Sequence, residues 1–565
     1  MHPYRSLFSL TLTASLALAH ATSAAQAPYD ADYYRSPVDH NIKVSGTFGE
    51  LRQDHFHMGL DIKSARGVAG DPLYAVADGY VSRLRVSAAG YGNAVYIDHP
   101  NGTRSVYAHL DAFAPELQAF LDSVHYAEER YELDIPLHAD TPNSLTAGAR
   151  HFPITKGQYL GTMGNTGSSF GAHLHFELRL ADSDAAFNPL LYDLPVTDTR
   201  APELRGLSVY ARLPGGATRL LERVEPVKRG DGYVLAEPLR VPPGDIGFGL
   251  KAYDRQQGTR NLNGVFNIES RCDGEVHWRA QYDTVAFEDT RYIQAHYDYP
   301  AKRGGQGYFY RLHRLPGDRL TLHEAAPDDG FLPLGFGESR SMRITASDPL
   351  GNATTLTFRI IADLEAEAPA FPSYHHVLRP GEPATLSVGA ATLDVPPRAV
   401  YATTYLTTEV SDTVAAGAYS RCYTLGDPDE PIHEPITLRI PLERVPMALR
   451  PSAYLTSCGG GTTSLSAKLS TGSSHLEAAL EEWGSYELHV DTTPPTIRVL
   501  DRYTYLLEDD ITAARDLRYR VTQNGAWVLA SFDAKKNRLA LRRDKLSKGK
   551  IEVEVWDAAG NRKAN

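Results

Sequence analysis

The chain has 565 residues, a formal net charge of −12 and a pI of about 6.0. This length excludes a single hydrophobic core, so several domains are expected. Its 57 Lys and Arg residues are dispersed rather than clustered, which argues against nucleic acid as a partner and favours solubility as the role of the charge.

Residues 1–25 have the composition of a secretory signal peptide. Arg5 supplies a positive charge, residues 7–19 form an apolar run, and small residues follow up to Ala25. We therefore expect cleavage there and export to the periplasm or the cell exterior. The apolar run is shorter than the roughly 20 residues that a membrane span needs, and no other stretch approaches that length. No transmembrane segment is expected, and nothing in the sequence indicates an oligomeric state.

Residues 38–192 have the pattern of an antiparallel sheet domain. Short β-branched and aromatic runs at 80–87, 93–98 and 103–110 are separated by turn sequences. One helix interrupts this meander, because Pro115 suits a first helical turn and apolar residues follow at helical spacing up to Val124. We expect the helix to be a packed insertion beside the functional site, followed by an alternating strand over 131–137.

Beyond residue 192 the chain consists of many short strand patterns with frequent Pro and Gly, and it contains two partial repeats. Asp198-Thr199-Arg200-Ala201-Pro202 is echoed by Asp491-Thr492-Thr493-Pro494-Pro495, and a D-x-x-G-N sequence recurs at 348–352 and 557–561. These repeats predict immunoglobulin-like β-sandwiches at 198–363 and 491–565, with a further β-rich domain at 370–490. The D-x-x-G-N sequences favour turns between strands, with calcium coordination as the alternative. The expected fold class is therefore dominated by β-structure.

Three Cys residues are too few for a disulfide-rich scaffold. Cys422 and Cys458 lie in one expected domain and form the candidate pair, although spacing alone does not establish a disulfide. Cys272 is then expected to be single and buried. The absence of C-x-x-C spacing disfavours thiolate zinc sites.

Two histidine motifs in residues 38–192 have the spacing of metal ligands. His173 and His175 are two apart on an expected strand, so their side chains project to the same face. His57 and Asp61 are four apart, and a strand or turn around Gly59 can direct both inward. His57, Asp61 and His175 together leave the fourth tetrahedral position open for water, as in catalytic rather than structural zinc sites. The expected cofactor is Zn²⁺, and the implied reaction is hydrolysis of an amide.

Two further histidines suit the proton transfers that amide hydrolysis needs. His109 and His173 titrate near neutrality in their unperturbed state, which fits a general base or acid. The sequence does not assign which of the two is the base. Glu177 shares the face of His175 and is either an acceptor for its second nitrogen or a solvated strand end.

Four motifs in this order carry a family resemblance: His57-x-x-x-Asp61, Tyr107-Ala108-His109-Leu110, Gly164-Asn165-Thr166-Gly167 and His173-Leu174-His175-Phe176-Glu177. Over roughly residues 40–192 they resemble the M23 zinc metallopeptidases, the lysostaphin and LytM type of peptidoglycan hydrolases. The resemblance implies a LytM-type antiparallel sheet, zinc binding by His57, Asp61 and His175, and catalysis by His109 and His173.

The segment 45–57 is similar to a longer Bacteroidetes-like subgroup of this family that carries β-sandwich tails. His55 is expected not to bind zinc, and His99 is expected to be structural. One departure is Ala172, since many members have Pro before the two histidines, where it would only stiffen a turn.

The resemblance implies a secreted zinc endopeptidase that hydrolyses peptide cross-links of peptidoglycan, its expected partner. The alternative is a non-catalytic cell-wall binding protein or amidase activator of the same fold. Such members have lost ligand or catalytic residues, whereas all five positions are filled here, which favours the enzyme. A third hypothesis is a surface adhesin or substrate-positioning protein dominated by the β-domains.

Overall fold

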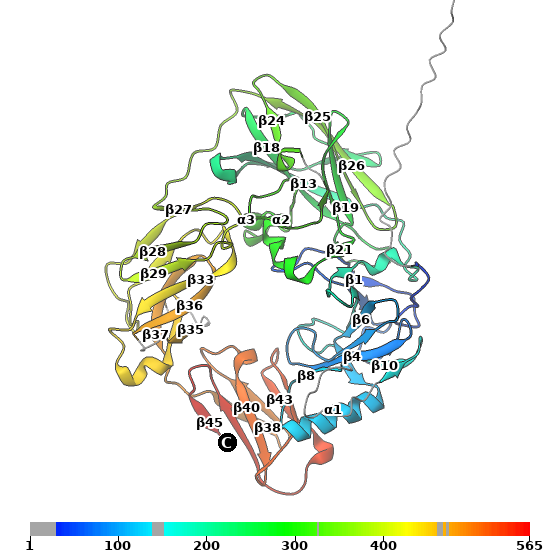
Figure 1. Cartoon of the computed structure of the whole chain (residues 1–565), viewed down its shortest axis with the longest axis vertical. Coiled ribbons are helices and arrows are strands. Elements are labelled where there is room, and N and C mark those ends of the chain that lie inside the picture. Colours follow the sequence, from blue (N-terminus) through cyan, green and yellow to red (C-terminus); the bar gives the residue numbers. More distant parts are fainter. Residues whose placement is uncertain (1–29, 138–151, 325–326, 460–466, 470–473) are drawn as a thin grey trace, which may run out of the picture.

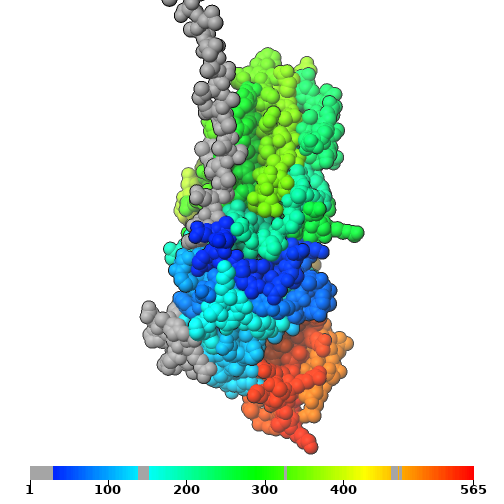
Figure 2. Space-filling view, turned by 90° about the vertical axis from the view of Figure 1, so that its right-hand side faces the viewer, coloured from blue at the N-terminus to red at the C-terminus, as the bar shows by residue number. Residues whose placement is uncertain are grey.

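The structure, a computed structural model, describes residues 30–137, 152–324, 327–459, 467–469 and 474–565. The predicted signal peptide lies outside these residues. Figure 1 shows four β-rich domains arranged as a ring, in which the fourth domain returns to helix α1 of the first. In Figure 2 the first domain, blue to cyan, lies between the green second domain and the red fourth domain. The predicted β-dominated fold class is confirmed.

The first domain, from β1 to β12, contains an antiparallel sheet in the order β1-β2-β11-β6-β5-β4-β8. Strands β9 and β12 pair with its β4 and β11, and a smaller sheet has the order β3-β10-β7. The bounds are β1 Val44–Gly46, β2 Leu60–Lys63, β3 Pro72–Tyr74, β4 Gly79–Val86, β5 Ala94–Asp98, β6 Thr103–Ala108, β7 Leu110–Phe113, β8 Leu133–Pro136, β9 Pro153–Ile154, β10 Tyr159–Met163, β11 His173–Leu180 and β12 Ala186–Phe187.

Strand β11 lies inside the main sheet between β2 and β6, and it is buried on both faces. On one face Leu174 and Phe176 pack with Leu60 and Tyr107 in the core of the domain, and all four side chains are fully buried. The other face presents His173 and His175. The apolar residues thus hold the strand in place while alternation directs the histidines to the opposite side.

The predicted helix is present as α1, Pro115–Glu128. It buries Leu117 and Leu121 against the domain core, and Glu129 ends it in the left-handed conformation at φ 48°. The alternation predicted after the helix is also present, since β8 buries every second residue. The helix packs beside the sheet rather than among the motif histidines, as expected.

The second domain, from β13 to β26, packs a sheet in the order β14-β13-β18-β22, with β24 on β18, against a sheet in the order β15-β16-β26-β25-β19-β20-β23, with β17 on β26. The fully buried Leu207, Phe248, Trp278 and Ile344 share its core. The bounds are β13 Glu203–Arg212, β14 Thr218–Val224, β15 Val227–Arg229, β16 Gly232–Val234, β17 Leu239–Val241, β18 Gly244–Tyr253, β19 Asn267–Cys272, β20 Glu275–Gln281, β21 Thr284–Val285, α2 Ile293–His296, α3 Tyr299–Arg303, β22 Tyr310–Arg311, β23 His323–Glu324, β24 Leu332–Leu334, β25 Ser339–Ser347 and β26 Ala353–Ala362.

Strand β21 leaves the second domain and pairs with β12, which extends the main sheet of the first domain. Cys272 is half-buried rather than buried as predicted, because it is the last residue of β19 and the turn at Asp273 follows. Burial raises the pKa of its thiol.

The third domain, from β27 to β37, contains sheets in the orders β28-β29-β33-β36-β35 and β31-β32-β37-β34, with β27 paired to β30. The candidate disulfide Cys422–Cys458 is present. The bounds are β27 His376–Leu378, β28 Ala384–Val388, β29 Ala391–Val395, β30 Thr404–Leu406, β31 Thr408–Val410, β32 Tyr423–Leu425, β33 Pro431–Pro441, β34 Ala453–Ser457, β35 Ala467–Leu469, β36 His475–Glu482 and β37 Gly484–Val490.

The fourth domain, from β38 to β45, packs two four-stranded sheets in the orders β38-β39-β43-β42 and β41-β40-β44-β45. Its core includes the fully buried Leu507, Val521, Leu539 and Val553. The bounds are β38 Thr496–Asp501, β39 Thr504–Glu508, β40 Arg518–Gln523, β41 Ala526–Trp527, β42 Ala530–Asp533, β43 Arg538–Leu541, β44 Ile551–Trp556 and β45 Arg562–Ala564.

Candidate metal centre and active site

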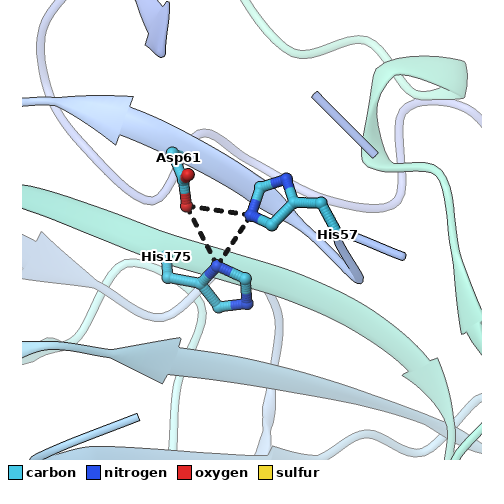
Figure 3. A group of neighbouring side chains, drawn as sticks. All are labelled: His57, Asp61 and His175. Atoms are coloured by element: carbon cyan, nitrogen blue, oxygen red, sulfur yellow. Dashed lines mark hydrogen bonds and ion pairs between the residues drawn. The ribbon is translucent and has the colours of Figure 1, made fainter. Parts of the chain in front are cut away.

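His57, Asp61 and His175 converge at one point of the first domain (Figure 3). Asp61 Oδ1 lies 3.0 Å from His57 Nε2 and 3.0 Å from His175 Nδ1, and the two nitrogens are 3.0 Å apart. His57 is 5% and His175 7% exposed. Three ligand atoms therefore face one another in a nearly dry setting.

Strand register and one glycine produce this convergence. His175 of β11 is directly opposite Asp61 of β2 in the antiparallel pairing. The chain before β2 passes so close to β11 that a Cβ on Gly59 would lie 2.3 Å from the carbonyl oxygen of Phe176. Only glycine allows this approach, and it brings His57 over the two strands.

Each imidazole is oriented by a hydrogen bond from its other nitrogen. His57 Nδ1 donates to the carbonyl oxygen of Thr47 at 2.8 Å, which leaves the Nε2 lone pair directed at Asp61. His175 Nε2 donates to Glu177 Oε1 at 2.7 Å, which directs Nδ1 at Asp61. When both rings are neutral, each presents an unprotonated nitrogen to the same point, as metal ligands must.

Glu177 is a fully buried acceptor and not a solvated strand end. Tyr91 donates its hydroxyl to Oε1 at 2.7 Å, and Arg179 Nε donates to Oε2 at 2.5 Å. Burial opposes ionisation of Glu177, but the charge of Arg179 and the His175 hydrogen bond hold its pKa well below the usual range. A permanent carboxylate therefore supports His175.

The ionisable groups of the triad are shifted by burial and by one another. Burial lowers the pKa of His57. Burial also disfavours the charged forms of His175 and Asp61, yet hydrogen bonds from His175 to Asp61 and Glu177 raise the pKa of His175 to about 9. The charge of His57 and the histidine hydrogen bonds hold the pKa of Asp61 well below its usual range. A metal ion at this point would displace the proton of His175.

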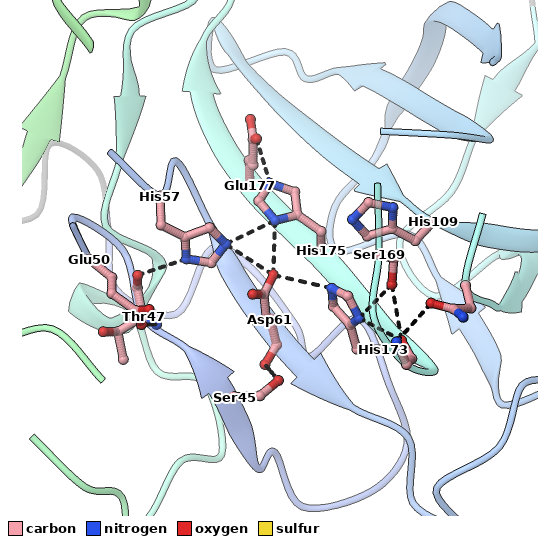
Figure 4. A network of polar contacts seen from close by, with 12 residues as sticks. Ser45, Thr47, Glu50, His57, Asp61, His109, Ser169, His173, His175 and Glu177 are labelled. Carbon is pink, nitrogen blue, oxygen red and sulfur yellow. Dashed lines mark hydrogen bonds and ion pairs between the residues drawn. The ribbon is translucent and has the colours of Figure 1, made fainter. Parts of the chain in front are cut away.

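His109 and His173 lie beside the triad without joining it (Figure 4). Their ring centroids are 4.9 Å apart, and that of His109 is 5.9 Å from His175. His109 Nδ1 donates to the carbonyl oxygen of Thr166 at 2.8 Å, so its Nε2 is unprotonated in the neutral ring. Burial, followed by the charges of His175 and His173, lowers the pKa of His109 to about 3.

His173 is held by the loop that precedes β11. Its Nδ1 lies 2.8 Å from the carbonyl oxygen of Gly171 and 3.2 Å from Ser169 Oγ, and its Nε2 lies 3.4 Å from Asp61 Oδ1. His173 and His175 lie on the same face of β11. His175 belongs to the triad, and His173 lies at its edge.

A cleft of about 860 Å³ opens over these residues. All five motif side chains line it, together with Arg52 and Lys63 of the first domain. Phe170 is fully exposed on its wall, and Asn261 and Phe287 contribute from the second domain. The second domain therefore forms part of the wall of this cleft.

His55 and His99, two other histidines of the described part of this region, lie apart from the triad. The His55 side chain is 52% exposed, and its Nδ1 lies 2.6 Å from Asp54 Oδ1. His99 is buried, with Nδ1 2.8 Å from the carbonyl oxygen of Asp78 and Nε2 2.8 Å from Ser105 Oγ.

Sequence reasoning did not identify Tyr91, Arg179 or Arg52 as parts of the site. Arg179 continues the alternation of His175 and Glu177, so its inward position could have been inferred. Arg52 Nη2 lies 3.2 Å from Asp61 Oδ2, a contact that no spacing rule indicates.

An antiparallel sheet thus presents two histidines and an aspartate that could hold a metal ion, beside two further histidines. Residues 55–120 match the model of Peptidase family M23. Residues 375–491 match the model of a Zu5-like domain.

The curated relatives match less than a third of this chain. The DD-carboxypeptidase/endopeptidase Mpg of Neisseria meningitidis is 29% identical over 161 residues, which cover 28% of this chain and 28% of Mpg. Lipoprotein NlpD of Yersinia enterocolitica is 29% identical over 22% of this chain and 93% of NlpD. This chain thus matches less than a third of the length of Mpg.

Two solved structures are each similar to less than a third of the chain. A zinc-containing peptidase from Vibrio cholerae is 21% identical, with 29% of this chain and 38% of that chain covered and a TM-score of 0.17. Helicobacter pylori Csd3 is 24% identical, with 29% and 36% covered and a TM-score of 0.17.

Proposed function

We propose that this chain is an exported zinc endopeptidase that hydrolyses peptide cross-links of bacterial peptidoglycan. The observation that carries the proposal is the triangle of His57 Nε2, Asp61 Oδ1 and His175 Nδ1, with two uncoordinated histidines beside it. The signal-like composition of residues 1–25 supports export. In the part of the chain that the structure describes, no helix is long and apolar enough to cross a membrane.

The triad fits Zn²⁺ because two neutral imidazole nitrogens and one carboxylate oxygen form a common donor set of catalytic zinc. Zinc bound there would lower the pKa of a coordinated water to about 7 and polarise the scissile carbonyl. Thr47 and Glu177 fix the ring orientations that such binding requires.

His109 and His173 supply the proton transfers in this proposal. His109 Nδ1 donates to the carbonyl oxygen of Thr166, so the Nε2 of the neutral ring can accept a proton from the attacking water. His173 Nε2, beside Asp61, can carry a proton to the oxyanion or to the leaving amine. Cleavage then adds OH to the carbonyl carbon and a proton to the amine nitrogen, which balances the hydrolysis.

The cleft fits a peptide with free carboxylates. Arg52 and Lys63 line it and can pair with such groups, while the exposed Phe170 offers an apolar contact. Mpg is named a DD-carboxypeptidase and endopeptidase, which favours direct cross-links between peptide stems as the substrate.

The test is digestion of purified sacculi, followed by mass spectrometry of the released muropeptides. We expect His109→Ala and His173→Ala each to lower the rate of release by at least about 100-fold. His55→Ala is the matched control, because His55 is a cleft histidine outside the triad, and it should retain activity.

Equal digestion by wild type and His109→Ala would overturn the proposed chemistry. Zinc content separates the enzyme from the non-catalytic alternative. Sacculus binding without digestion, with less than about half a zinc per chain even after zinc is added, would favour a cell-wall binding protein or amidase activator instead.

A further inference from the structure

Two clusters of three aspartates lie outside the candidate active site. The first aspartate cluster is Asp198, Asp254 and Asp348, and the second is Asp491, Asp509 and Asp557. Within each cluster, one carboxylate oxygen from each residue lies within 4.8 Å of the others. Such crowding of like charges requires an explanation.

The clusters occupy the same topological place in two domains. In each, one aspartate precedes the first strand, β13 or β38, and the second follows the strand that pairs with it, β18 or β39. The third opens the D-x-x-G-N turn that leads into the last strand, β26 or β45. The recurrence means that each fold delivers three carboxylates to one end of the domain.

The D-x-x-G-N turn positions the third aspartate. Asp348 Oδ1 accepts from Asn352 N at 2.8 Å, and its Oδ2 accepts from Asn352 Nδ2 at 2.7 Å. Asp557 accepts the same two bonds from Asn561, each at 2.8 Å. The predicted turn is therefore present in both domains.

The asparagines also tie the turn to the start of the domain. The amide of Asn352 donates to the backbone carbonyl of Asp198 at 3.4 Å, and that of Asn561 donates to the carbonyl of Asp491 at 3.2 Å. In both domains this link brings the first and third aspartates together.

The remaining carboxylates include buried oxygens without partners. Asp254 is 4% exposed, and its Oδ1 has no hydrogen-bond partner. In the second cluster Asp491 is 5% exposed, and its Oδ2 and that of Asp509 have no partner. Among the described residues, none of the six carboxylates forms an ion pair with Lys or Arg.

Burial, followed by the charges of Asp348 and Asp198, raises the pKa of Asp254 to about 7. Buried acceptors that face other carboxylates are costly unless a cation joins them. The unpaired oxygens of Asp254, Asp491 and Asp509 therefore point to a missing positive charge in both clusters.

We propose that each aspartate cluster binds one Ca²⁺ ion. The donors are all oxygen, which suits a hard cation and not the nitrogen-preferring zinc of the candidate active site. Ca²⁺ takes six to eight oxygens in flexible geometry, so carboxylates, nearby carbonyls and water can complete its shell, whereas Mg²⁺ demands near-ideal octahedral geometry. This inference is independent of the proposed peptidase activity.

The two sites lie at domain junctions. The first follows the first domain in the chain, and the second joins the third domain to the fourth. The loop after Asp254 contacts the first domain directly. Gln256 accepts from Val44 N at 2.7 Å and donates to the carbonyl of Ile42 at 3.0 Å, while Gly264 N donates to Thr47 Oγ1 at 3.1 Å. Ca²⁺ at the first aspartate cluster would thus hold the loop after Asp254 more rigidly. This loop contacts residues 42–47, the segment that orients His57 through Thr47.

Isothermal titration of the EDTA-treated mature chain with CaCl₂ tests the proposal. We expect two Ca²⁺ per chain for wild type, one for Asp254→Asn, one for Asp509→Asn and none for the double variant. The matched control is Asp231→Asn, an exposed aspartate outside both clusters, which should retain two.

Thermal unfolding separates ion binding from a purely structural role. In EDTA the Asp254→Asn chain should melt at or above the wild-type temperature, because a repulsive charge is removed. In CaCl₂ it should melt below wild type, because one site is lost. A wild-type melting temperature unaffected by CaCl₂, unchanged stoichiometry in the double variant, or equal binding of MgCl₂ would overturn the assignment. None of these results depends on peptidase activity, so the two proposals fail separately.

Discussion

The buried carboxylate of Glu177 orients His175 from the side opposite Asp61. It accepts the Nε2 proton of His175 and is itself neutralised by Arg179. We predict that Glu177→Gln lowers zinc affinity by about 10- to 100-fold, because a neutral amide supports the imidazole less well and leaves Arg179 without its charge partner. Competition with a chromogenic zinc chelator measures the change.

Glu116→Gln provides the control for this substitution. Glu116 is an exposed residue of the first turn of α1, and its replacement should leave zinc affinity unchanged. Wild-type affinity in the Glu177→Gln chain would show that Glu177 stabilises the fold alone and does not tune the ligand.

The motif residues could be selected from the sequence. The residues that hydrogen-bond to them and orient them could not. Alternation placed His173 and His175 on one face, and the structure has them there. The support of His57 by Thr47 and the contact of Arg52 with Asp61 arise from the loop before β2, whose path depends on tertiary packing. No local periodicity encodes such a path, and the roles of the five motif residues stay predictions.

At the scale of elements, the second domain holds a pair of buried neutral histidines. His296 Nδ1 lies 3.1 Å from His323 Nε2, and the rings of His323 and Trp278 have centroids 4.5 Å apart. Burial, followed by the charge of Arg311, lowers the pKa of His296 to about 3. Burial, followed by the charge of His296, lowers that of His323 well below its usual value.

These shifts predict acid sensitivity with a definite sign. The unfolded chain binds protons at both histidines below a pH of about 6.5, whereas the folded chain does not. The free energy of unfolding is therefore fully retained above that pH and falls by roughly 3 kcal/mol per pH unit as the pH decreases towards the folded pKa. Urea unfolding followed by tryptophan fluorescence between pH 7.5 and 5 measures the slope.

His323→Gln removes one of the two histidines. It should therefore reduce the slope of the free energy of unfolding against pH by roughly 1.4 kcal/mol per pH unit. His55→Gln, at an exposed histidine, should leave it unchanged. If the slopes of wild type and His323→Gln coincide, the pair does not remain neutral in the folded state.

The sequence predicted which strands and helices of the first domain are present better than it predicted where they begin and end. The 103–110 run was predicted as one strand, but His109 adopts φ 65° and divides it into β6 and β7. Helices α2 and α3 and the parallel pairing of β26 with β16 and β17 were not predicted. The parallel pairing joins segments that lie far apart in the sequence, and patterns of short range do not contain it, whereas α3 has a local signal in its N-cap Asp298 and in Pro300.

At the scale of the whole molecule, the fourth domain closes the ring by contacts with the first. Tyr131, just after α1, has ring centroids 4.6 Å from Tyr519 and 4.8 Å from Trp527, and its hydroxyl accepts from Val521 N at 2.8 Å. Lys535 Nζ donates to the carbonyl of Ser169, in the loop that holds His173. The last domain thus reaches the edge of the candidate active site.

Aromatic packing rather than ion pairing should hold this closure. Glu129 and Arg520 pair at 2.6 Å, but both side chains are nearly half exposed, and such surface pairs contribute about 0–1 kcal/mol. Tyr131→Ala removes two aromatic contacts and a hydrogen bond, so we expect the ring to open and the radius of gyration in small-angle X-ray scattering to rise. Arg520→Ala should leave it at the wild-type value. An unchanged radius in Tyr131→Ala would mean that the three intervening domain junctions are rigid enough to hold the fourth domain against α1 without this contact.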